Sequence, residues 1–124
     1  MIDINGIEES VLIEAQDFNM PVLQLYNEIS VRNKSLSESD ARSLASRIIG
    51  AMVAEGLVTL VRGTYREIDE DCYSLETMRD LSPEETDLIL KRPDRWEEKD
   101  VFSLTETYEL AITERGTKRL DRCR

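Results

Sequence analysis

Acidic side chains gather in two short runs, and these are the residues whose type and spacing could do chemistry in this sequence. The first run contains Glu67, Asp69, Glu70 and Asp71, and the second contains Asp94, Glu97, Glu98 and Asp100, which surround the only tryptophan, Trp96. Grouped carboxylates can bind Ca²⁺, can act as a general acid and base, or can attract a basic protein. These three uses make different demands on the neighbouring residues.

The neighbouring residues argue against metal binding and catalysis. The segment 69–73 lacks the glycine and the distal glutamate of an EF-hand loop. The chain contains no His, which excludes His-based acid/base catalysis, Ser-His and Cys-His nucleophile pairs and most zinc sites. Glu84 and Glu85 are better explained as residues of a first helical turn, where the helix dipole favours acids. We therefore expect a protein that is not an enzyme and that holds no cofactor and no metal.

The acidic runs favour a docking surface for a basic protein, because patches of one charge raise encounter rates and repel like-charged partners. The candidate contacts are Asp69, Glu70, Asp71, Glu97 and Glu98, with Trp96 as an aromatic anchor. A simpler alternative stays open for each part of this surface. The acids can form an ordinary solvated surface, and Trp96 can pin its segment to the rest of the domain by covering Leu88 or Leu90.

The net charge of −10 is distributed unevenly along the chain. Residues 1–29 carry six acids and no base, and residues 67–109 carry fifteen acids and five bases. Residues 30–66 carry six bases and three acids, and residues 110–124 carry five bases and two acids. The acidity therefore belongs to two segments, and a narrow basic band lies between them.

Length and apolar pattern predict one domain in the cytoplasm. A chain of 124 residues suits a single domain. Cys72 and Cys123 lie far apart and form neither a metal-binding pair nor a disulfide framework, so they are expected to be ordinary thiols in a reducing compartment. The first residues lack the basic segment of a signal peptide, and the longest apolar runs are far shorter than the roughly 20 residues that cross a bilayer. We expect no membrane partner.

Three helices are expected in the first half of the chain. Apolar residues at helical spacing predict helices at about residues 7–17, 21–32 and 38–55. Ser37 and Asp40 have the spacing of a capping box at the start of the third helix. Gly56 is placed to end that helix in a left-handed conformation.

The second half of the chain predicts two strands and two shorter helices. Residues 57–61 are rich in strand-forming side chains, with 64–66 as an extension, and residues 108–112 alternate as a half-buried strand does. Ser82 and Pro83 start a short helix to about residue 91, and Thr113 can cap a last helix through residue 120. The predicted fold class is mainly α with a small antiparallel sheet, an α+β fold, with an acidic insert at about residues 67–106 between the two strands.

Two stretches resemble a known family. Residues 45–58, from Ala45 to Val58, resemble the recognition helix and following strand of MarR-like and PadR-like regulators. Residues 108–120 resemble the closing strand and last helix of the same proteins, in the spacing of Tyr108, Thr113 and Gly116. The resemblance implies a single winged-helix-like domain over residues 1–124, with an atypical acidic insert in the wing.

The resemblance also implies a DNA-binding surface. In such regulators the third helix lies in the major groove, and the wing contacts the phosphate backbone. The residues that would face the bases are Arg42, Ser43, Ser46 and Arg47, and the wing contacts would be Arg62 and Arg66. An alternative stays open here too: the serines can be solvated, and Arg42 and Arg47 can pair with acids on adjacent turns, such as Glu38 or Asp40.

Charge favours a protein partner over DNA. DNA affinity comes largely from neutralised phosphates, and an acidic insert in the wing works against it. The leading hypothesis is therefore a non-enzymatic protein that binds a basic partner, in the manner of an immunity protein or an antitoxin facing a toxin. The alternative is a small transcriptional regulator that binds double-stranded DNA through the helix at about 38–55. For either function the amphipathic first helix is a candidate homodimer interface.

Overall fold

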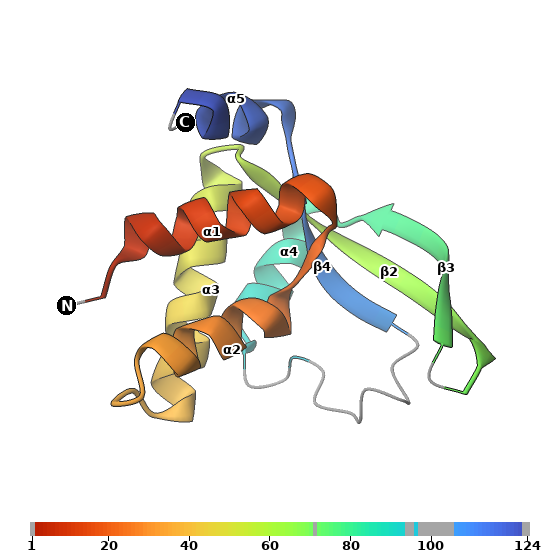
Figure 1. The fold of residues 1–124 in the computed structure, drawn as a ribbon, viewed down its shortest axis with the longest axis horizontal. Helices are drawn as coiled ribbons and strands as arrows, with labels where there is room; N and C mark the ends of the chain where they lie inside the picture. Colours follow the sequence, from red (N-terminus) through yellow and green to blue (C-terminus); the bar gives the residue numbers. More distant parts are fainter. Residues whose placement is uncertain (1, 71, 94–95, 97–105, 123–124) are drawn as a thin grey trace.

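The computed structural model describes residues 2–70, 72–93, 96 and 106–122. In these residues it has the helices α1 (Ile4–Asp17), α2 (Val22–Arg32), α3 (Glu38–Ala54), α4 (Pro83–Leu90) and α5 (Glu114–Arg122). The strands are β1 (Met20–Pro21), β2 (Val58–Asp69), β3 (Cys72–Asp80) and β4 (Glu106–Ile112), and they form one antiparallel sheet in the order β1-β4-β2-β3 (Figure 1). The predicted α+β fold class is confirmed.

Local capping signals mark the start of α1 and both ends of α3. α1 starts at Ile4, earlier than predicted, because the Asp3 side chain accepts a hydrogen bond from the Gly6 amide at 2.9 Å. α3 starts behind Ser37, whose hydroxyl accepts from the Asp40 amide at 3.1 Å. Gly56 follows the end of α3 with a φ of 75°, the left-handed conformation expected of it. All three predicted helices are confirmed.

The core lies between these helices and one face of the sheet. Its most deeply buried members include Val11, Leu25, Ile29, Ile49, Met52, Leu60 and Leu110. They come from α1, α2, α3, β2 and β4, so burial of their apolar surface ties the helical layer to the sheet. Figure 1 shows the helices gathered at one end of the molecule, while β2 and β3 extend away from them.

The sheet differs from the prediction in one strand. The strand predicted at 57–61 is β2, which continues to Asp69, and the strand predicted at 108–112 is β4. Residues 72–80, which lie within the acidic insert expected at about 67–106, form a strand that was not predicted: β3 pairs with β2 from Asp80 opposite Val61 to Cys72 opposite Asp69. β3 is an edge strand whose described side chains are largely exposed, so it lacks the apolar alternation that reveals a half-buried strand.

The two C-terminal helices start as their sequences predict. Ser82 and Glu85 form a full capping box at α4: the Glu85 amide donates to the Ser82 hydroxyl, and the Ser82 amide donates to the Glu85 carboxylate, each at 3.1 Å. At α5 the Gly116 amide donates to the Thr113 hydroxyl at 3.0 Å. Both short helices and their caps are confirmed.

An ion pair between the end of β3 and the start of α4 makes stability depend on pH. Arg79 donates two hydrogen bonds to the Glu85 carboxylate, at 3.0 and 2.9 Å. These two bonds, and a third that the carboxylate accepts from the Ser82 amide, lower the pKa of Glu85 from its ordinary 4.5 to about 2. A lowered pKa stabilises the folded state above the ordinary value, and the benefit is lost as the pH falls through about 2. We expect the melting temperature of wild type to exceed that of Glu85→Gln at pH 6 and the two to converge near pH 2.

Glutamine preserves the helix cap in this experiment, since its side-chain oxygen can still accept from the Ser82 amide. Glu84→Gln is the matched control, because Glu84 is an exposed neighbour without an ion pair among the described residues. Thermal unfolding followed by circular dichroism between pH 2 and 6 provides the measurement. A constant difference between wild type and Glu85→Gln over that range would contradict the assignment of the pH effect to Glu85.

Candidate functional site

The first acidic run lies on a hairpin that extends from the body of the protein. β4 pairs with β2 only as far as Thr64, so among the described residues the outer half of β2 pairs with β3 alone. On this two-stranded part, Glu67, Asp69 and Glu70 are all exposed. Asp71 lies outside the described residues. The structure therefore places two of the predicted acidic contacts, Asp69 and Glu70, together with Glu67 at one exposed end of the molecule (Figure 1).

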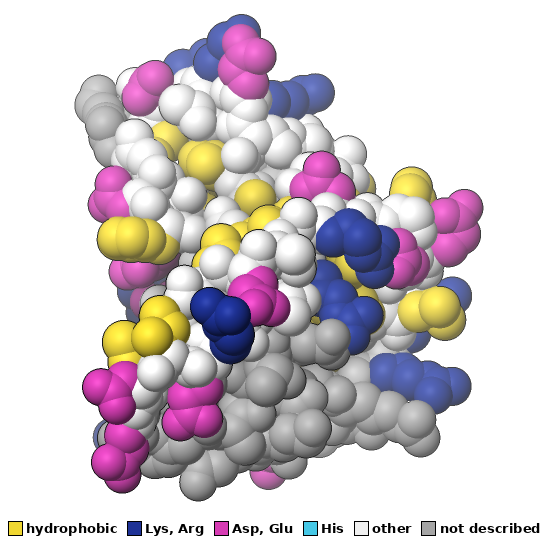
Figure 2. Space-filling view, turned by 90° about the vertical axis from the view of Figure 1, so that its right-hand side faces the viewer, with side chains coloured by type: hydrophobic (Ala, Val, Ile, Leu, Met, Phe, Trp, Pro, Cys, Tyr) yellow, Lys and Arg dark blue, Asp and Glu magenta, His cyan; other side chains and the backbone are white. Residues whose placement is uncertain are grey.

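The arginines on the hairpin do not neutralise these three acids. Arg66 pairs with Glu76 at 3.5 Å, and Arg79 is held by Glu85 of α4. Among the described residues, Glu67, Asp69 and Glu70 make no ion pair, and residues 67–80 carry six acids and one base. Figure 2 views this end of the molecule and shows Asp and Glu side chains next to Lys and Arg side chains on it. The outer part of the hairpin thus has a net negative field.

Trp96 does not act as an exposed anchor in this structure. Its side chain is 2% exposed and belongs to the hydrophobic core, and the indole N–H donates to the Ile89 carbonyl oxygen at 3.0 Å. These contacts match the alternative hypothesis, in which Trp96 packs against the rest of the domain. Leu88 is 65% exposed, so Trp96 does not cover it. Glu97 and Glu98, the other predicted contacts of that run, lie outside the described residues.

Arg42 is a structural residue, and the expectation that it faces DNA bases is wrong. It is 6% exposed, its guanidinium lies 4.5 Å from the centre of the Tyr26 ring, and Nη1 donates to the Pro93 carbonyl oxygen at 2.7 Å. Its Nε lies 3.5 Å from the Glu38 carboxylate one turn away, which confirms the alternative pairing. Arg42 therefore joins α2 and α3 to the chain that follows α4.

The position of α4 changes what α3 can present. Ser46 was expected to face DNA bases. Its hydroxyl instead donates to the Leu90 carbonyl oxygen, so Ser46 faces α4. Gly50, one turn later, also faces Leu90. Ser43 and Arg47 remain exposed. α4 thus covers part of the surface that a recognition helix would insert into the major groove.

The wing arginines share one face of the hairpin. Arg62 and Arg66 lie four residues apart on β2, and Arg79 of β3 is in register with Arg62. Arg62 is half-buried, whereas the Arg66 side chain is 72% exposed and lies beside Glu76. The structure therefore brings these predicted wing residues together, but pairs the exposed one with an acid.

A buried carboxylate at the root of the hairpin was not predicted. Glu109 is 4% exposed and accepts hydrogen bonds from the hydroxyls of Tyr65 and Thr107. Burial, followed by the hydrogen bond and the charge of Glu109, raises the pKa of Tyr65 to about 12. The alternation of β4 placed Glu109 on a solvated face, but that face is also covered here, since Val61 opposite Glu109 is buried. The hydrogen bond from Tyr65 joins β4 to β2 at the root of the hairpin.

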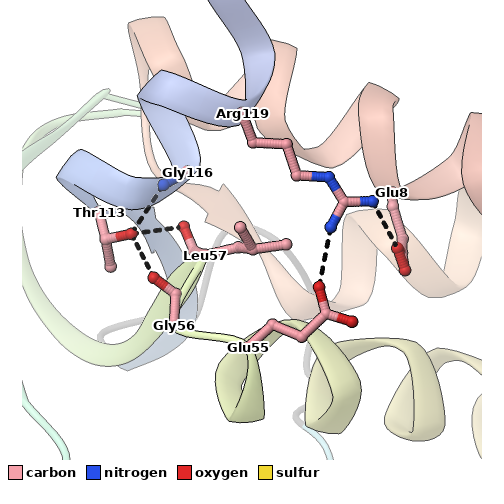
Figure 3. Close-up of polar contacts among 7 residues, drawn as sticks. All are labelled: Glu8, Glu55, Gly56, Leu57, Thr113, Gly116 and Arg119. Atoms are coloured by element: carbon pink, nitrogen blue, oxygen red, sulfur yellow. Dashed lines mark hydrogen bonds and ion pairs between the residues drawn. The ribbon is translucent and has the colours of Figure 1, made fainter. Parts of the chain in front are cut away.

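Part of the N-terminal acidity is also structural. Arg119 of α5 lies 2.8 Å from the Glu55 carboxylate and 3.8 Å from that of Glu8, as Figure 3 shows. The three residues come from α5, α3 and α1, so this cation joins three helices. Glu8 is therefore largely buried behind Arg119 and adds little to a surface for a basic partner.

The described residues show no preformed metal site and no membrane segment. No group of three or more His, Cys, Asp or Glu side chains within them could hold a metal ion. None of the described helices is both long enough and apolar enough to cross a bilayer. A groove of about 350 Å³ between α3 and α4 is mainly apolar, with Asp87 as the one ionisable side chain among its lining residues. The acidic hairpin is the strongest candidate site.

Comparisons with known proteins found no match to this chain. No protein-family model matches it, and neither the curated proteins nor the solved structures contain a match. The architecture itself, three helices followed by a small antiparallel sheet with a long hairpin, is α+β and compatible with a winged-helix domain. The case for a function therefore depends on the geometry of the chain itself.

Proposed function

We propose that this is a non-enzymatic winged-helix-like protein that binds a basic protein partner through the β2–β3 hairpin. The observation that carries the proposal is the exposed group of Glu67, Asp69 and Glu70 on the two-stranded end of the hairpin, where the nearby arginines pair with other acids. Such a field accelerates encounter with a basic partner and repels acidic ones. An immunity-like or antitoxin-like role against a basic toxin fits this chemistry.

Several features support the finer parts of the proposal. The order of α1, α2 and α3 before the hairpin supports a winged helix, as does the MarR-like and PadR-like pattern at residues 45–58 and 108–120. The free thiol of Cys72 favours a cytoplasmic location, where thiols stay reduced. The buried Arg42 and the contact between Ser46 and α4 favour protein over DNA, because they remove two of the four residues that would read bases.

Charge reversal on the hairpin tests the proposal. We expect the combined change Glu67→Lys, Asp69→Lys and Glu70→Lys to weaken binding of a fluorescent lysine-rich peptide by at least about tenfold at low salt, where surface charges are poorly screened. The matched control reverses Glu9, Glu14 and Asp17 on the exposed side of α1, which changes the net charge by the same amount. Fluorescence anisotropy titration measures both affinities.

The two triple variants distinguish a site from general attraction. Equal losses in both would show that the peptide responds only to net charge, and an unchanged affinity in the hairpin variant would remove the hairpin from the site. Either result contradicts the proposal. When the titrations are repeated at 0.1 M salt, the control variant is expected to lose less than about threefold, since exposed charges more than a Debye length of roughly 10 Å away are then largely screened.

DNA binding stays as the second candidate because Arg47 and Ser43 are exposed on α3. A labelled DNA duplex is therefore titrated beside the peptide. Binding of the duplex at low salt, lost on Arg47→Ala and accompanied by no binding of the peptide, would replace the protein-binding proposal with a regulator. Phosphate attraction is strongest at low salt, so a lack of duplex binding there excludes the regulator.

A further inference from the structure

The sheet has two edges, and among the described residues one of them, β3, is unpaired along a full strand. β1 ends the sheet on one side with Met20 and Pro21 alone, and both its shortness and its proline limit pairing with another strand. β3 ends the sheet on the other side with nine residues, Cys72–Asp80, most of them exposed. β3 is therefore the edge of the described sheet that can accept a further strand.

The pairing register shows which backbone groups of β3 face outward. The Leu81 amide donates to the Leu60 carbonyl oxygen at 3.0 Å, just beyond the pair of Asp80 and Val61. Hydrogen-bonded and non-hydrogen-bonded pairs alternate in an antiparallel ladder. Thr77 and Arg79 therefore bond to β2, whereas the N–H and C=O groups of Met78 and Asp80 point to the free edge.

A hydrogen bond at the end of the β2–β4 pair leads to the same assignment of inward and outward groups. The Thr113 amide donates to the Leu57 carbonyl oxygen at 3.1 Å, so odd-numbered residues of β2 bond to β4 and even-numbered ones bond to β3. Thr64, which is opposite Thr77, is thus directed toward β3. The two observations agree that the outward donors are those of Met78 and Asp80.

The side chains at this edge combine apolar and acidic groups on one face. Leu75 and Met78 are 48% and 38% exposed and lie in register with Tyr65 and Gly63. Asp80 shares their face through its pairing with Val61. Arg79 points to the other face and is held by Glu85, so it does not offset the negative charge of Asp80.

We infer that the partner docks by adding an extended, basic segment as a further strand beside β3. The inference rests on the proposed function and names the way that function is carried out. Backbone hydrogen bonds to Met78 and Asp80 would hold the segment, and its Lys or Arg side chains would alternate with apolar ones beside Leu75 and Met78. Charge selects a basic occupant, because residues 67–80 carry six acids and one base.

A second copy of this chain is a poor occupant for the same edge. β3 itself carries two acids and one base, so the acidic excess lies mainly at residues 67–71 beside it. Two antiparallel β3 strands would bring the Cys72 end of each copy, next to these acids, close to Asp80 of the other, and like charges close together destabilise a strand pair. Each copy also has a net charge of −10. Self-association through β3 is therefore not expected, and the experiment below includes a measurement that would detect it.

Amide hydrogen exchange in the wild-type protein tests the inference directly. The probe is a blocked peptide in which lysine alternates with valine, and its control has the valines replaced by proline, which cannot donate to a ladder. We expect the lysine–valine peptide to slow exchange of the Met78 and Asp80 amides by at least about tenfold. The Thr77 and Arg79 amides, already bonded to β2, should change little.

Two substitutions at one position supply the second measurement. Met78→Pro removes an outward N–H while leaving the bonds of β3 to β2, whereas Met78→Ala keeps that N–H. Both variants lose the contact in which the Asn19 amide nitrogen lies 3.1 Å from the Met78 sulfur, so this contact cancels in the comparison. We expect Met78→Pro to bind the peptide at least about tenfold more weakly than Met78→Ala, with circular dichroism showing both folded.

The outcomes separate this inference from the proposed function. If Met78→Pro binds as well as Met78→Ala while the hairpin charge reversal abolishes binding, strand addition is wrong and the acidic docking surface stands. If the wild-type protein does not bind the peptide at low salt, both fail. Slow exchange at Met78 and Asp80 without peptide, together with a dimeric mass in solution, would make a second copy the occupant and overturn the inference.

Discussion

Replacing Trp96 with alanine is expected to lower the free energy of unfolding by about 3 to 5 kcal/mol, the usual cost of removing a large buried aromatic side chain. The indole is 2% exposed and packs in the core, and its N–H bonds to the Ile89 carbonyl at the end of α4. Truncation leaves a cavity and removes one hydrogen bond to the Ile89 carbonyl oxygen, which still accepts from the Arg92 amide at 3.2 Å. Urea unfolding followed by circular dichroism measures the loss.

Two further observations separate this structural role from a role in binding. Trp96→Phe keeps most of the apolar volume and loses the hydrogen bond, so it should cost less, about 1 to 2 kcal/mol. Because the chain has a single tryptophan, native fluorescence reports this site alone and should be blue-shifted and shielded from acrylamide. A stable Trp96→Ala variant with weakened peptide binding would instead restore Trp96 as an interface anchor.

Burial of Trp96 places the proposed docking surface on the hairpin. With Trp96 buried, recognition in the proposed complex would depend on charge, on the backbone of β3 and on apolar side chains such as Leu75 and Met78. Exposed ion pairs contribute little each, with a median near 0 to 1 kcal/mol. Backbone hydrogen bonds along an edge therefore provide the ordered contact that the charges alone lack.

The features that the sequence predicted well depend on residues close together in the chain. Ser37, Ser82 and Thr113 cap helices through amides three residues away, and Gly56 ends α3 by its own backbone conformation. Such signals need no tertiary information. The starts of α3, α4 and α5 followed from them.

The features that the sequence did not predict depend on distant contacts. Arg42 is buried because Tyr26 and Pro93, far away in the chain, cover it, and Ser46 is covered because α4 lies across α3. A local pattern cannot show which helix another helix will cover. For the same reason the resemblance to a recognition helix suggested base contacts that the packing of α4 prevents.

The sequence predicted the acidic residues of the candidate site but not the strand that lies beside them. Asp69 and Glu70 are exposed on the hairpin as a docking surface requires, but the strand beside them was hidden because β3 has a polar sequence. A bulge in the pairing near Tyr65 also interrupts its alternation. The edge, and with it the outward amides of Met78 and Asp80, could be found only from the register.

Replacing Gly116 with alanine should destabilise the protein by about 3 kcal/mol, at the upper end of the usual cost of overpacking. α5 begins against the turn between α3 and β2, where the Thr113 hydroxyl lies 2.5 Å from the Gly56 carbonyl oxygen and 3.0 Å from that of Leu57 (Figure 3). A Cβ at Gly116 would overlap the Leu57 carbonyl oxygen and lie 2.8 Å from the Ile112 side chain. The oxygen belongs to the backbone and cannot rotate away, so α5 must shift.

Gly50→Ala is the matched control, since its new methyl group would meet only Leu90 Cδ1 at an ordinary 3.8 Å. Alanine has the higher helix propensity, so this change within α3 should raise stability by up to about 1 kcal/mol. Urea unfolding of both variants measures the difference. Similar stabilities for the two would mean that α5 is loosely attached. The contacts of Thr113 and Arg119 with the α3–β2 turn would then contribute little to holding it.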